Sequence, residues 1–409
     1  MRIPQRTAHF MLVLEAVILI IVLVLGIISP ITAPEKNQTG NSTGSELGST
    51  NENQIGGTQG TEGTEVEKPE DSEKPAEPLE PVFSKEILAK VDAMTLEQKV
   101  AQMFIVTPEA LAKVDKVTVM GNTTKNALKQ YPVGGFVYSS KNFQNKAQTT
   151  KMLKAVQEFC KKELGTPMLL MVEERGGADY SPLASANGYK VQASPSEIGS
   201  TGDVQNAIDA VKEISKYLKE AGFNMNLAPN TDSYASNSSV TAMMVAETVS
   251  SYGQQKIMTV MSMFPGKSDG AFMNDTKEEW EAAEGLAFKG GINAGVNAIM
   301  VGNVYASAFT GNDATSCSMS EEVVKYIRAN MQYQGVLISD SLSESIVTSN
   351  FTSAQAAVAV VSAGMDMIYC PANFEEAYQG VLDAVNSGVI TEEMIDESVA
   401  RILTCKQTI

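Results

Sequence analysis

The stretch Gly335-Val336-Leu337-Ile338-Ser339-Asp340 decides the fold class of this chain. Its apolar residues form a short run of the kind that fills a buried parallel strand, and a carboxylate follows where the run ends. Seven other short apolar runs lie in the same part of the chain. The sequence therefore predicts eight strands, at 103–106, 135–137, 168–172, 225–227, 257–261, 298–301, 336–338 and 367–369.

Amphipathic stretches of helical length separate these runs. Examples lie at 147–163, 204–221, 276–294, 320–331 and 354–363. A strand that alternates with a helix is typical of an α/β fold with a parallel sheet and crossover helices. Eight such units in about 325 residues predict a single (β/α)8 TIM-type barrel domain over residues 83–409, and a doubly wound open sheet is the alternative.

The N-terminus has the features of a membrane anchor. From Phe10 to Ile28 the chain is apolar apart from Glu15, and at 1.5 Å per residue this run is about 28 Å long, close to the ~30 Å of a hydrocarbon core. Arg2 and Arg6 precede it. The pattern predicts a cytoplasmic segment at 1–9, a single transmembrane signal anchor at 10–31 and a barrel on the extracytoplasmic side of the cell membrane. A cleaved signal peptide, with 31–33 as a weak cleavage site, is the alternative.

Residues 32–82 have the composition of a disordered linker. They are rich in Gly, Ser, Thr, Asn, Glu and Pro and hold almost no large apolar residue, so they cannot form a core. The linker is acidic, and the whole chain has a formal net charge of −17. Nucleic acid is excluded as a partner because binding it requires clustered Lys and Arg.

Histidine and cysteine usage restricts the chemistry further. The only histidine, His9, precedes the apolar run, so the folded region has no imidazole for catalysis or metal binding. The four cysteines, Cys160, Cys317, Cys370 and Cys405, lie far apart without a CxxC pair. This spacing indicates small core residues, with a disulfide as the alternative.

Six segments resemble the N-terminal domain of family 3 glycoside hydrolases, and they occur in the order of that family. They are 94–103 (MTLEQKVAQM), 132–137 (PVGGFV), 221–229 (AGFNMNLAP), 294–301 (AGVNAIMV), 335–340 (GVLISD) and 395–403 (IDESVARIL). Together they cover the whole domain. With no second α/β domain after Leu403, the chain is most similar to the single-domain β-N-acetylhexosaminidase branch.

The resemblance implies a retaining glycosidase that hydrolyses terminal β-linked N-acetylhexosamine glycosides without a metal or an organic cofactor. Retention requires a carboxylate that attacks the anomeric carbon and a second group that protonates the leaving oxygen. Asp340 occupies the family's nucleophile position, at the end of the seventh strand. A structural alternative for Asp340 is a turn or helix-capping residue at the start of 342–347.

Several sugar-binding positions depart from the family pattern. The family's Lys-His-Phe-Pro-Gly-His-Gly reads SMFPGKS at 262–268, and its Asp-x-Glu-Gly-Gly reads EERGG at 173–177. The Asp-x-His loop and the Arg-x-Phe-Gly stretch have no counterpart. Candidate substrate-binding residues at or near the family positions are Glu173, Asp232, Asn303, where the family often has His, and Lys267, which is also readable as a surface lysine.

Two functional classes follow from this pattern. In the first, the chain is a divergent cell-surface glycosidase with Asp340 as nucleophile and a carboxyl group in place of the imidazole acid. Asp269, Asp275 and Glu344 are the candidates for that acid, although the favoured interpretation of each is an exposed carboxylate of a loop or helix face. In the second, it is an inactive barrel that binds a glycan or a protein at the cell surface.

Removal of residues 1–82 is expected to leave a soluble domain that unfolds cooperatively, because neither the apolar run nor the linker shares a core with the barrel. Circular dichroism and gel filtration of residues 83–409 check this. Aggregation of that fragment would contradict the predicted boundary.

Overall fold

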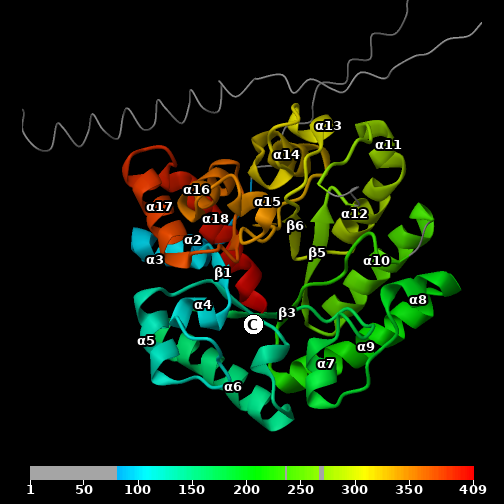
Figure 1. The fold of residues 1–409 in the computed structure, drawn as a ribbon, viewed down its shortest axis with the longest axis horizontal. Coiled ribbons are helices and arrows are strands. Elements are labelled where there is room, and N and C mark those ends of the chain that lie inside the picture. Colours follow the sequence, from blue (N-terminus) through cyan, green and yellow to red (C-terminus); the bar gives the residue numbers. More distant parts are fainter. Residues whose placement is uncertain (1–80, 235–236, 267–270) are drawn as a thin grey trace, which may run out of the picture. The chain divides into compact units, whose positions relative to one another are not determined.

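Eight parallel strands form a ring in the part of the chain that the computed structural model describes, which is residues 81–234, 237–266 and 271–409 (Figure 1). Strands β1 to β7 are neighbours in chain order, and β8 pairs with β1. A bridge between Ile338 and Met367 connects β7 to the start of β8, so the barrel is nearly closed. The doubly wound alternative is excluded, because its strand order reverses within the sheet.

All eight predicted strands are confirmed. They are β1 (Phe104–Val106), β2 (Gly135–Tyr138), β3 (Leu169–Val172), β4 (Met225–Asn226), β5 (Met258–Phe264), β6 (Ala298–Val301), β7 (Val336–Ser339) and β8 (Ile368–Tyr369). Almost every strand residue is buried, as expected for strands that helices cover on one side and the barrel interior on the other. The backbone just before β2 passes close to the backbone just before β1, which explains Gly134, where a Cβ atom would lie 2.0 Å from the carbonyl oxygen of Gln102.

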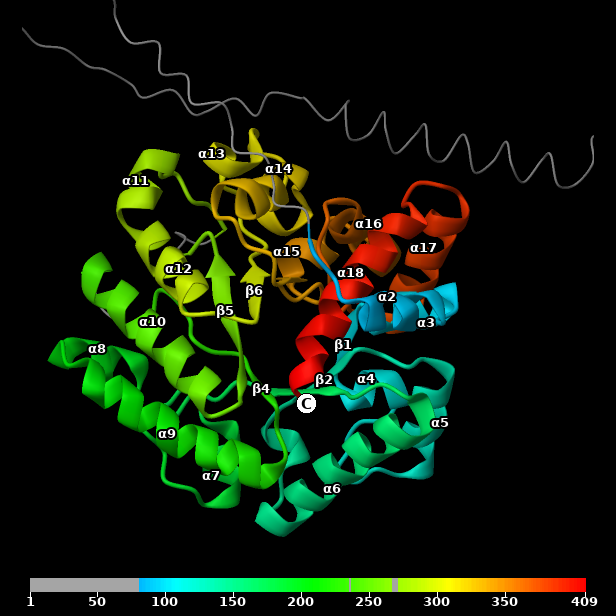
Figure 2. The same ribbon diagram turned by 180° about the vertical axis from the view of Figure 1, so that it is seen from behind.

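Helices cover the outside of the ring (Figures 1 and 2). The helices of the first half are α2 (Lys85–Asp92), α3 (Leu96–Gln102), α4 (Pro108–Ala112), α5 (Asn122–Gln130), α6 (Lys146–Phe159), α7 (Pro182–Asn187), α8 (Pro195–Thr201), α9 (Val204–Ala221) and α10 (Ser238–Gln254). Those of the second half are α11 (Lys277–Ala282), α12 (Glu284–Asn293), α13 (Ser307–Thr310), α14 (Glu321–Lys325), α15 (Ser345–Thr348), α16 (Ser353–Ser362), α17 (Phe374–Asn386) and α18 (Glu392–Cys405). Short 3-10 helices occupy Ser140–Asn142, Cys317–Met319 and Lys406–Thr408, and short π-helical turns occupy Cys160–Leu164 and Tyr326–Asn330.

The predicted helix at 204–221 is confirmed, but the one at 276–294 is wrong as a single helix. It breaks at Ala283, whose φ of −123° and ψ of −98° are not helical. The break accompanies the burial of Trp280, which packs against Phe264 and Phe309 with ring centroids 5.3 and 5.1 Å apart. The indole also lies so close to Gly285 that a Cβ there would be 2.8 Å from the ring. Tertiary packing of one large side chain therefore overrides the helical pattern.

The predicted helix at 320–331 is also interrupted. The chain changes from α14 to a π-turn at Tyr326–Asn330, which contains Arg328. The segment at 354–363 forms α16, and the one at 147–163 forms α6 followed by a second π-turn. All four cysteines lie in the described residues and are free thiols; Cys160 and Cys317 are buried as predicted for core residues, whereas Cys370 and Cys405 are partly exposed.

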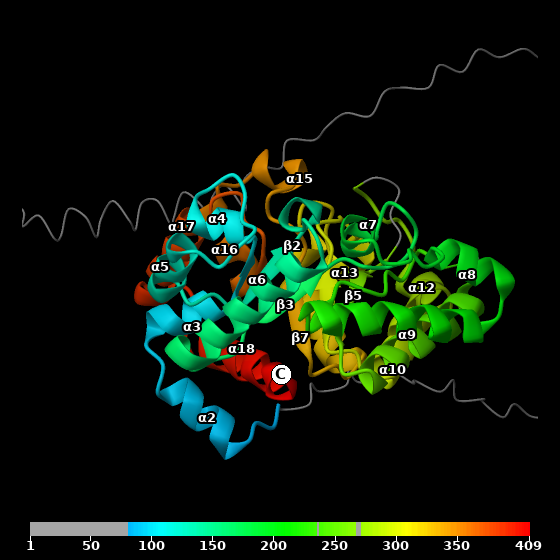
Figure 3. The ribbon, with the colours of Figure 1, turned by 90° about the horizontal axis from the view of Figure 1, so that it is seen from below.

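The two ends of the barrel carry different segments. Figure 3 shows α4, α7 and α15, which follow β1, β3 and β7, on one side, with α2 and the C-terminus on the other. The predicted anchor at 10–31 lies outside the described residues, as does the linker at 32–82 except for its last two residues. Among the described helices, none combines the length and apolarity needed to cross a bilayer.

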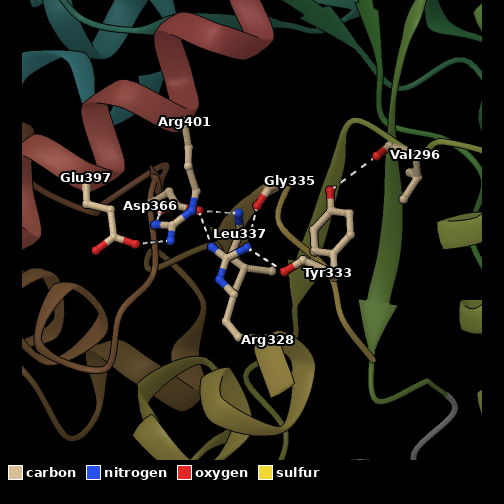
Figure 4. Close-up of polar contacts among 8 residues, drawn as sticks. All are labelled: Val296, Arg328, Tyr333, Gly335, Leu337, Asp366, Glu397 and Arg401. Carbon is tan, nitrogen blue, oxygen red and sulfur yellow. Dashed lines mark hydrogen bonds and ion pairs between the residues drawn. The ribbon is translucent and has the colours of Figure 1, made fainter. Parts of the chain in front are cut away.

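A buried ionic cluster holds the start of β7 and β8 together (Figure 4). Asp366, which precedes β8 and is fully buried, accepts a hydrogen bond from Arg328 Nη2 (2.7 Å) and another from Arg401 Nη1 (3.0 Å). The Leu337 amide of β7 also donates to Asp366 Oδ2 (2.7 Å). One carboxylate thus joins β7, the π-turn and α18, which packs beside α2 and α3 at the start of the domain (Figure 2).

Asp366→Asn is expected to lower the free energy of unfolding by about 3–5 kcal/mol, because it leaves the buried Arg328 guanidinium without a counter-charge and Arg401 with Glu397 alone. Urea unfolding of the variant and the wild type measures this. The matched control is Glu321→Gln, which breaks the exposed ion pair with Lys325 and should change stability by no more than about 1 kcal/mol. Equal effects of the two substitutions would contradict the role given to the buried cluster.

Candidate active site

Asp340 lies directly after β7, at the rim where the carboxyl ends of the parallel strands meet. Its amide donates to the carbonyl oxygen of Val301 in β6 (2.8 Å), which fixes the backbone at the strand exit. The side chain accepts hydrogen bonds from the amides of Ser341 (2.7 Å) and Asn303 (3.4 Å). Asp340 does not cap the following helix, because the N-cap of α15 is Glu344.

The charge of Asp340 is costly in this position. Burial, with the nearby charge of Glu344, raises the pKa of Asp340 to about 6, although the amides of Ser341 and Asn303 oppose the shift. The carboxyl is only 7% exposed. At neutral pH most molecules therefore carry a buried carboxylate at the barrel rim, in the form that a nucleophile requires.

Asn303 joins the loops after β6 and β7. It is buried, and its side-chain amide donates to the carbonyl oxygen of Ser341 (2.9 Å) and to Glu344 Oε2 (3.1 Å). Its Oδ1 accepts a hydrogen bond from the hydroxyl of Ser318 (2.7 Å). Asn303 was predicted to bind substrate, and the structure brings it to Asp340 with its side chain engaged by protein groups.

Glu173 follows β3 and faces the same part of the barrel. Its carboxylate pairs with Arg175 Nη2 (2.8 Å), and the Arg175 guanidinium in turn lies 3.8 Å from the ring centroid of Tyr180. Burial and the charges of its neighbours, among them Glu173 and Asp340, raise the pKa of Tyr369 in β8 well above its ordinary value. Glu173 and Asp340 therefore both lie near a neutral, partly buried phenol that sequence reasoning missed.

Comparison with protein families identifies the domain. The model of the glycosyl hydrolase family 3 N terminal domain matches residues 95–405. This chain belongs to glycosyl hydrolase family 3. The resemblance inferred from six short segments is thereby confirmed over most of the chain.

Similar proteins of known name are glycosidases. The beta-N-acetylglucosaminidase/beta-glucosidase of Cellulomonas fimi is 25% identical over 275 residues, which are 59% of this chain and 48% of that protein. Beta-hexosaminidase A of Pseudoalteromonas piscicida is 22% identical over 337 residues, which are 71% of this chain and 56% of that protein. The chain spans about half the length of these curated relatives.

Solved structures show the same fold. A family 3 β-N-acetylglucosaminidase from Paenibacillus sp. str. FPU-7 matches with a TM-score of 0.72 and 26% identity over 77% of this chain and 63% of that one. The β-N-acetylhexosaminidase of Beutenbergia cavernae matches with a TM-score of 0.66 and 19% identity over 76% of this chain and 98% of that one. The second match supports the fold alone.

Among the remaining predicted residues of this family 3 domain, those that the structure describes make no hydrogen bond with Asp340, and the others lie outside the described residues. Asp232 is exposed in the turn after β4, where its amide donates to Asn230 Oδ1 (3.0 Å). Asp275 is exposed immediately before the N-cap of α11. Lys267 and Asp269 lie outside the described residues. Within the described ranges, no three acidic, histidine or cysteine side chains are grouped so as to hold a metal ion.

Glu174 is a buried carboxyl that sequence reasoning passed over. It is fully buried and accepts hydrogen bonds from the Leu183 and Ala184 amides of α7 (2.9 and 3.3 Å) and from the Tyr217 hydroxyl (3.0 Å). Burial raises the pKa of Glu174 to about 7 against these hydrogen bonds. Its partners fix the loop after β3 and so position Glu173. The sequence motif alone carries no signal of this role, because the partners come from α7 and α9.

Asp340→Asn is expected to stabilise the domain relative to the wild type, and to do so more at pH 7.5 than at pH 4.5. Because the fold raises the pKa of Asp340, folding favours the protonated carboxyl of the wild type. This contribution to stability is complete below the ordinary pKa of 3.8 and is lost as the pH rises through about 6. A shift of this size corresponds to up to about 3 kcal/mol. Melting temperatures of variant and wild type at the two pH values measure the effect. Asp275→Asn, which changes an exposed carboxyl, is the control, and a difference independent of pH would contradict the buried charge.

Proposed function

We propose that this domain is a retaining glycosidase that hydrolyses terminal β-linked N-acetylhexosamine glycosides, with Asp340 as the nucleophile. The observation that carries the proposal is a buried carboxylate, held by two backbone amides, at the family's nucleophile position on the rim of a family 3 barrel. Barrel enzymes place their catalytic groups at this rim, at the carboxyl ends of the strands.

The chemistry proceeds in two displacements. A carboxylate oxygen of Asp340 bonds to the anomeric carbon as the bond from that carbon to the leaving oxygen breaks, and the leaving oxygen takes a proton from an acid. Water then attacks the anomeric carbon, gives a proton to the same group and releases Asp340. The amides of Ser341 and Asn303 keep the carboxylate in one orientation through both steps, which reduces the entropy that the reaction must lose.

The substrate class rests on the relatives. A β-N-acetylglucosaminidase/β-glucosidase, a β-hexosaminidase and a β-N-acetylglucosaminidase are among the proteins most similar to this chain. The location at the cell surface rests on sequence alone, namely the apolar run at 10–28 preceded by Arg2 and Arg6.

An inactive barrel that binds a glycan or a protein is the second candidate. The observation that favours it is the ion pair between Glu173 and Arg175, which occupies two positions that carry carboxylates in the family motif. The domain also contains no histidine to act as the family's acid. A test of function must therefore detect weak catalysis that depends on the nucleophile.

Asp340→Asn is expected to lower kcat/KM for 2,4-dinitrophenyl N-acetyl-β-glucosaminide by about 10³-fold or more, because it removes the attacking charge and little volume. This substrate needs little protonation of its leaving group, so it reports the nucleophile even where the acid is weak. A 2-fluoro or 5-fluoro sugar should trap a covalent adduct on Asp340, visible by mass spectrometry of a peptic digest.

The control for this experiment is Glu321→Gln, which alters an exposed carboxylate that pairs with Lys325 and has no part in the candidate site. A wild-type chain without turnover of activated glycosides and without an adduct would refute the enzyme and leave the binding module.

A further inference from the structure

A second carboxyl group lies beside Asp340, at Glu344. One residue connects the two: Asn303 donates its backbone N–H to Asp340 Oδ2 (3.4 Å) and its side-chain Nδ2–H to Glu344 Oε2 (3.1 Å). The carboxyls therefore converge on a single buried asparagine. Their proximity also appears in the electrostatics, since the charge of Glu344 contributes to the raised pKa of Asp340.

The backbone holds Glu344 at the start of α15 and leaves its side chain available. The Glu344 carbonyl oxygen accepts the amides of Val347 (3.0 Å) and Thr348 (2.9 Å), and its own amide donates to Ser341 (3.3 Å). Its side chain makes no capping hydrogen bond to the helix, although the residue occupies the N-cap position. Asn303, and not the helix, thus orients this carboxyl.

The two carboxyl groups differ in exposure and in the number of hydrogen bonds that hold them. Asp340 is buried and fixed by two amides, whereas Glu344 is exposed and held through one oxygen. A general acid must collect a proton from solvent before each turnover and exchange it again with the incoming water. Glu344 has this access. Asp275, the other described candidate, is exposed ahead of α11, and no contact among the described residues joins it to Asp340 or Asn303.

We propose that Glu344 is the general acid and base of this site and that Asn303 is its positioning residue. The proposal rests on the proposed function, because it assigns the proton transfers of the reaction in which Asp340 is the nucleophile. Two carboxyl groups in close proximity are the arrangement that retaining hydrolysis uses. Here both groups lie on the single loop that follows β7.

The proton balance closes in both steps. In the first, protonated Glu344 gives its proton to the leaving oxygen as Asp340 forms an ester with the sugar, so Glu344 becomes a carboxylate and the alcohol departs. The ester removes the negative charge of Asp340, so the Glu344 carboxylate that forms has no like charge beside it. In the second, Glu344 takes a proton from the attacking water, the sugar leaves with the hydroxyl, and Asp340 regains its charge.

The test compares Glu344→Gln with the wild type in the full chain, using aryl N-acetyl-β-glucosaminides whose leaving groups have different acidities. Loss of the acid should lower the rate of the first step by about 10²–10⁴-fold for poorly acidic phenols and far less for dinitrophenol. The dependence of kcat/KM on leaving-group acidity should therefore steepen. Asn303→Ala should steepen it in the same direction, and Asp275→Asn should not.

Sodium azide provides a readout that a structural role of Glu344 would not produce. Azide attacks the glycosyl ester without a base, so it should accelerate turnover of the dinitrophenyl substrate by Glu344→Gln and yield the β-glycosyl azide, detected by NMR. Asp340→Asn should give no such product. Unchanged leaving-group dependence in Glu344→Gln, or no azide product, would refute the role of Glu344 while Asp340-dependent turnover kept the proposed function. A wild type inactive on every activated glycoside would refute both.

Discussion

Asp366 is the residue through which the barrel closes. Backbone hydrogen bonds around the bridge between Ile338 and Met367 join β7 to β8, and beside them the Asp366 carboxylate accepts an amide of β7 and the guanidinium groups of Arg328 and Arg401. Asp340 directly follows this strand, three residues beyond Leu337, or about 10 Å at 3.3 Å per residue. The ionic cluster and the candidate nucleophile thus lie at opposite ends of one short strand. Because catalytic groups must be held to about 0.5 Å, loosening the closed end would also disturb the rim.

The sequence carried enough information for the barrel because strand positions depend on a local signal. Each run was short, apolar and separated from the next by a helix, and all eight runs formed strands in one ring. Helix ends were less predictable, as Ala283 shows. Thr276 to Ala294 has a continuous helical pattern, but burial of Trp280 between Phe264 and Phe309 interrupts it. That interaction joins residues far apart in sequence, so periodicity alone does not contain it.

The site was predictable to the extent that family position determines it. Asp340 and Asn303 lie together at the rim, in the order that the family segments implied. The partners of each side chain were not predictable, because they come from other loops. Arg175 neutralises Glu173, and Glu344 reaches Asn303 from the start of α15. Asp232 shows the opposite outcome, since a family-like position after β4 resulted in an exposed turn residue.

A raised pKa alone does not separate a catalytic carboxyl from a structural one in this barrel. The pKa of Glu174 is raised to about 7 and that of Asp340 to about 6, in both cases mainly by burial. Glu174 is surrounded by its partners in α7 and α9 and has no exposure, so substrate cannot reach it. Asp340 lies at the strand exit beside an exposed carboxyl that shares its asparagine. A neutral side chain at 340 would avoid the cost of burying charge, and retaining a carboxylate there is physically reasonable when chemistry uses that charge.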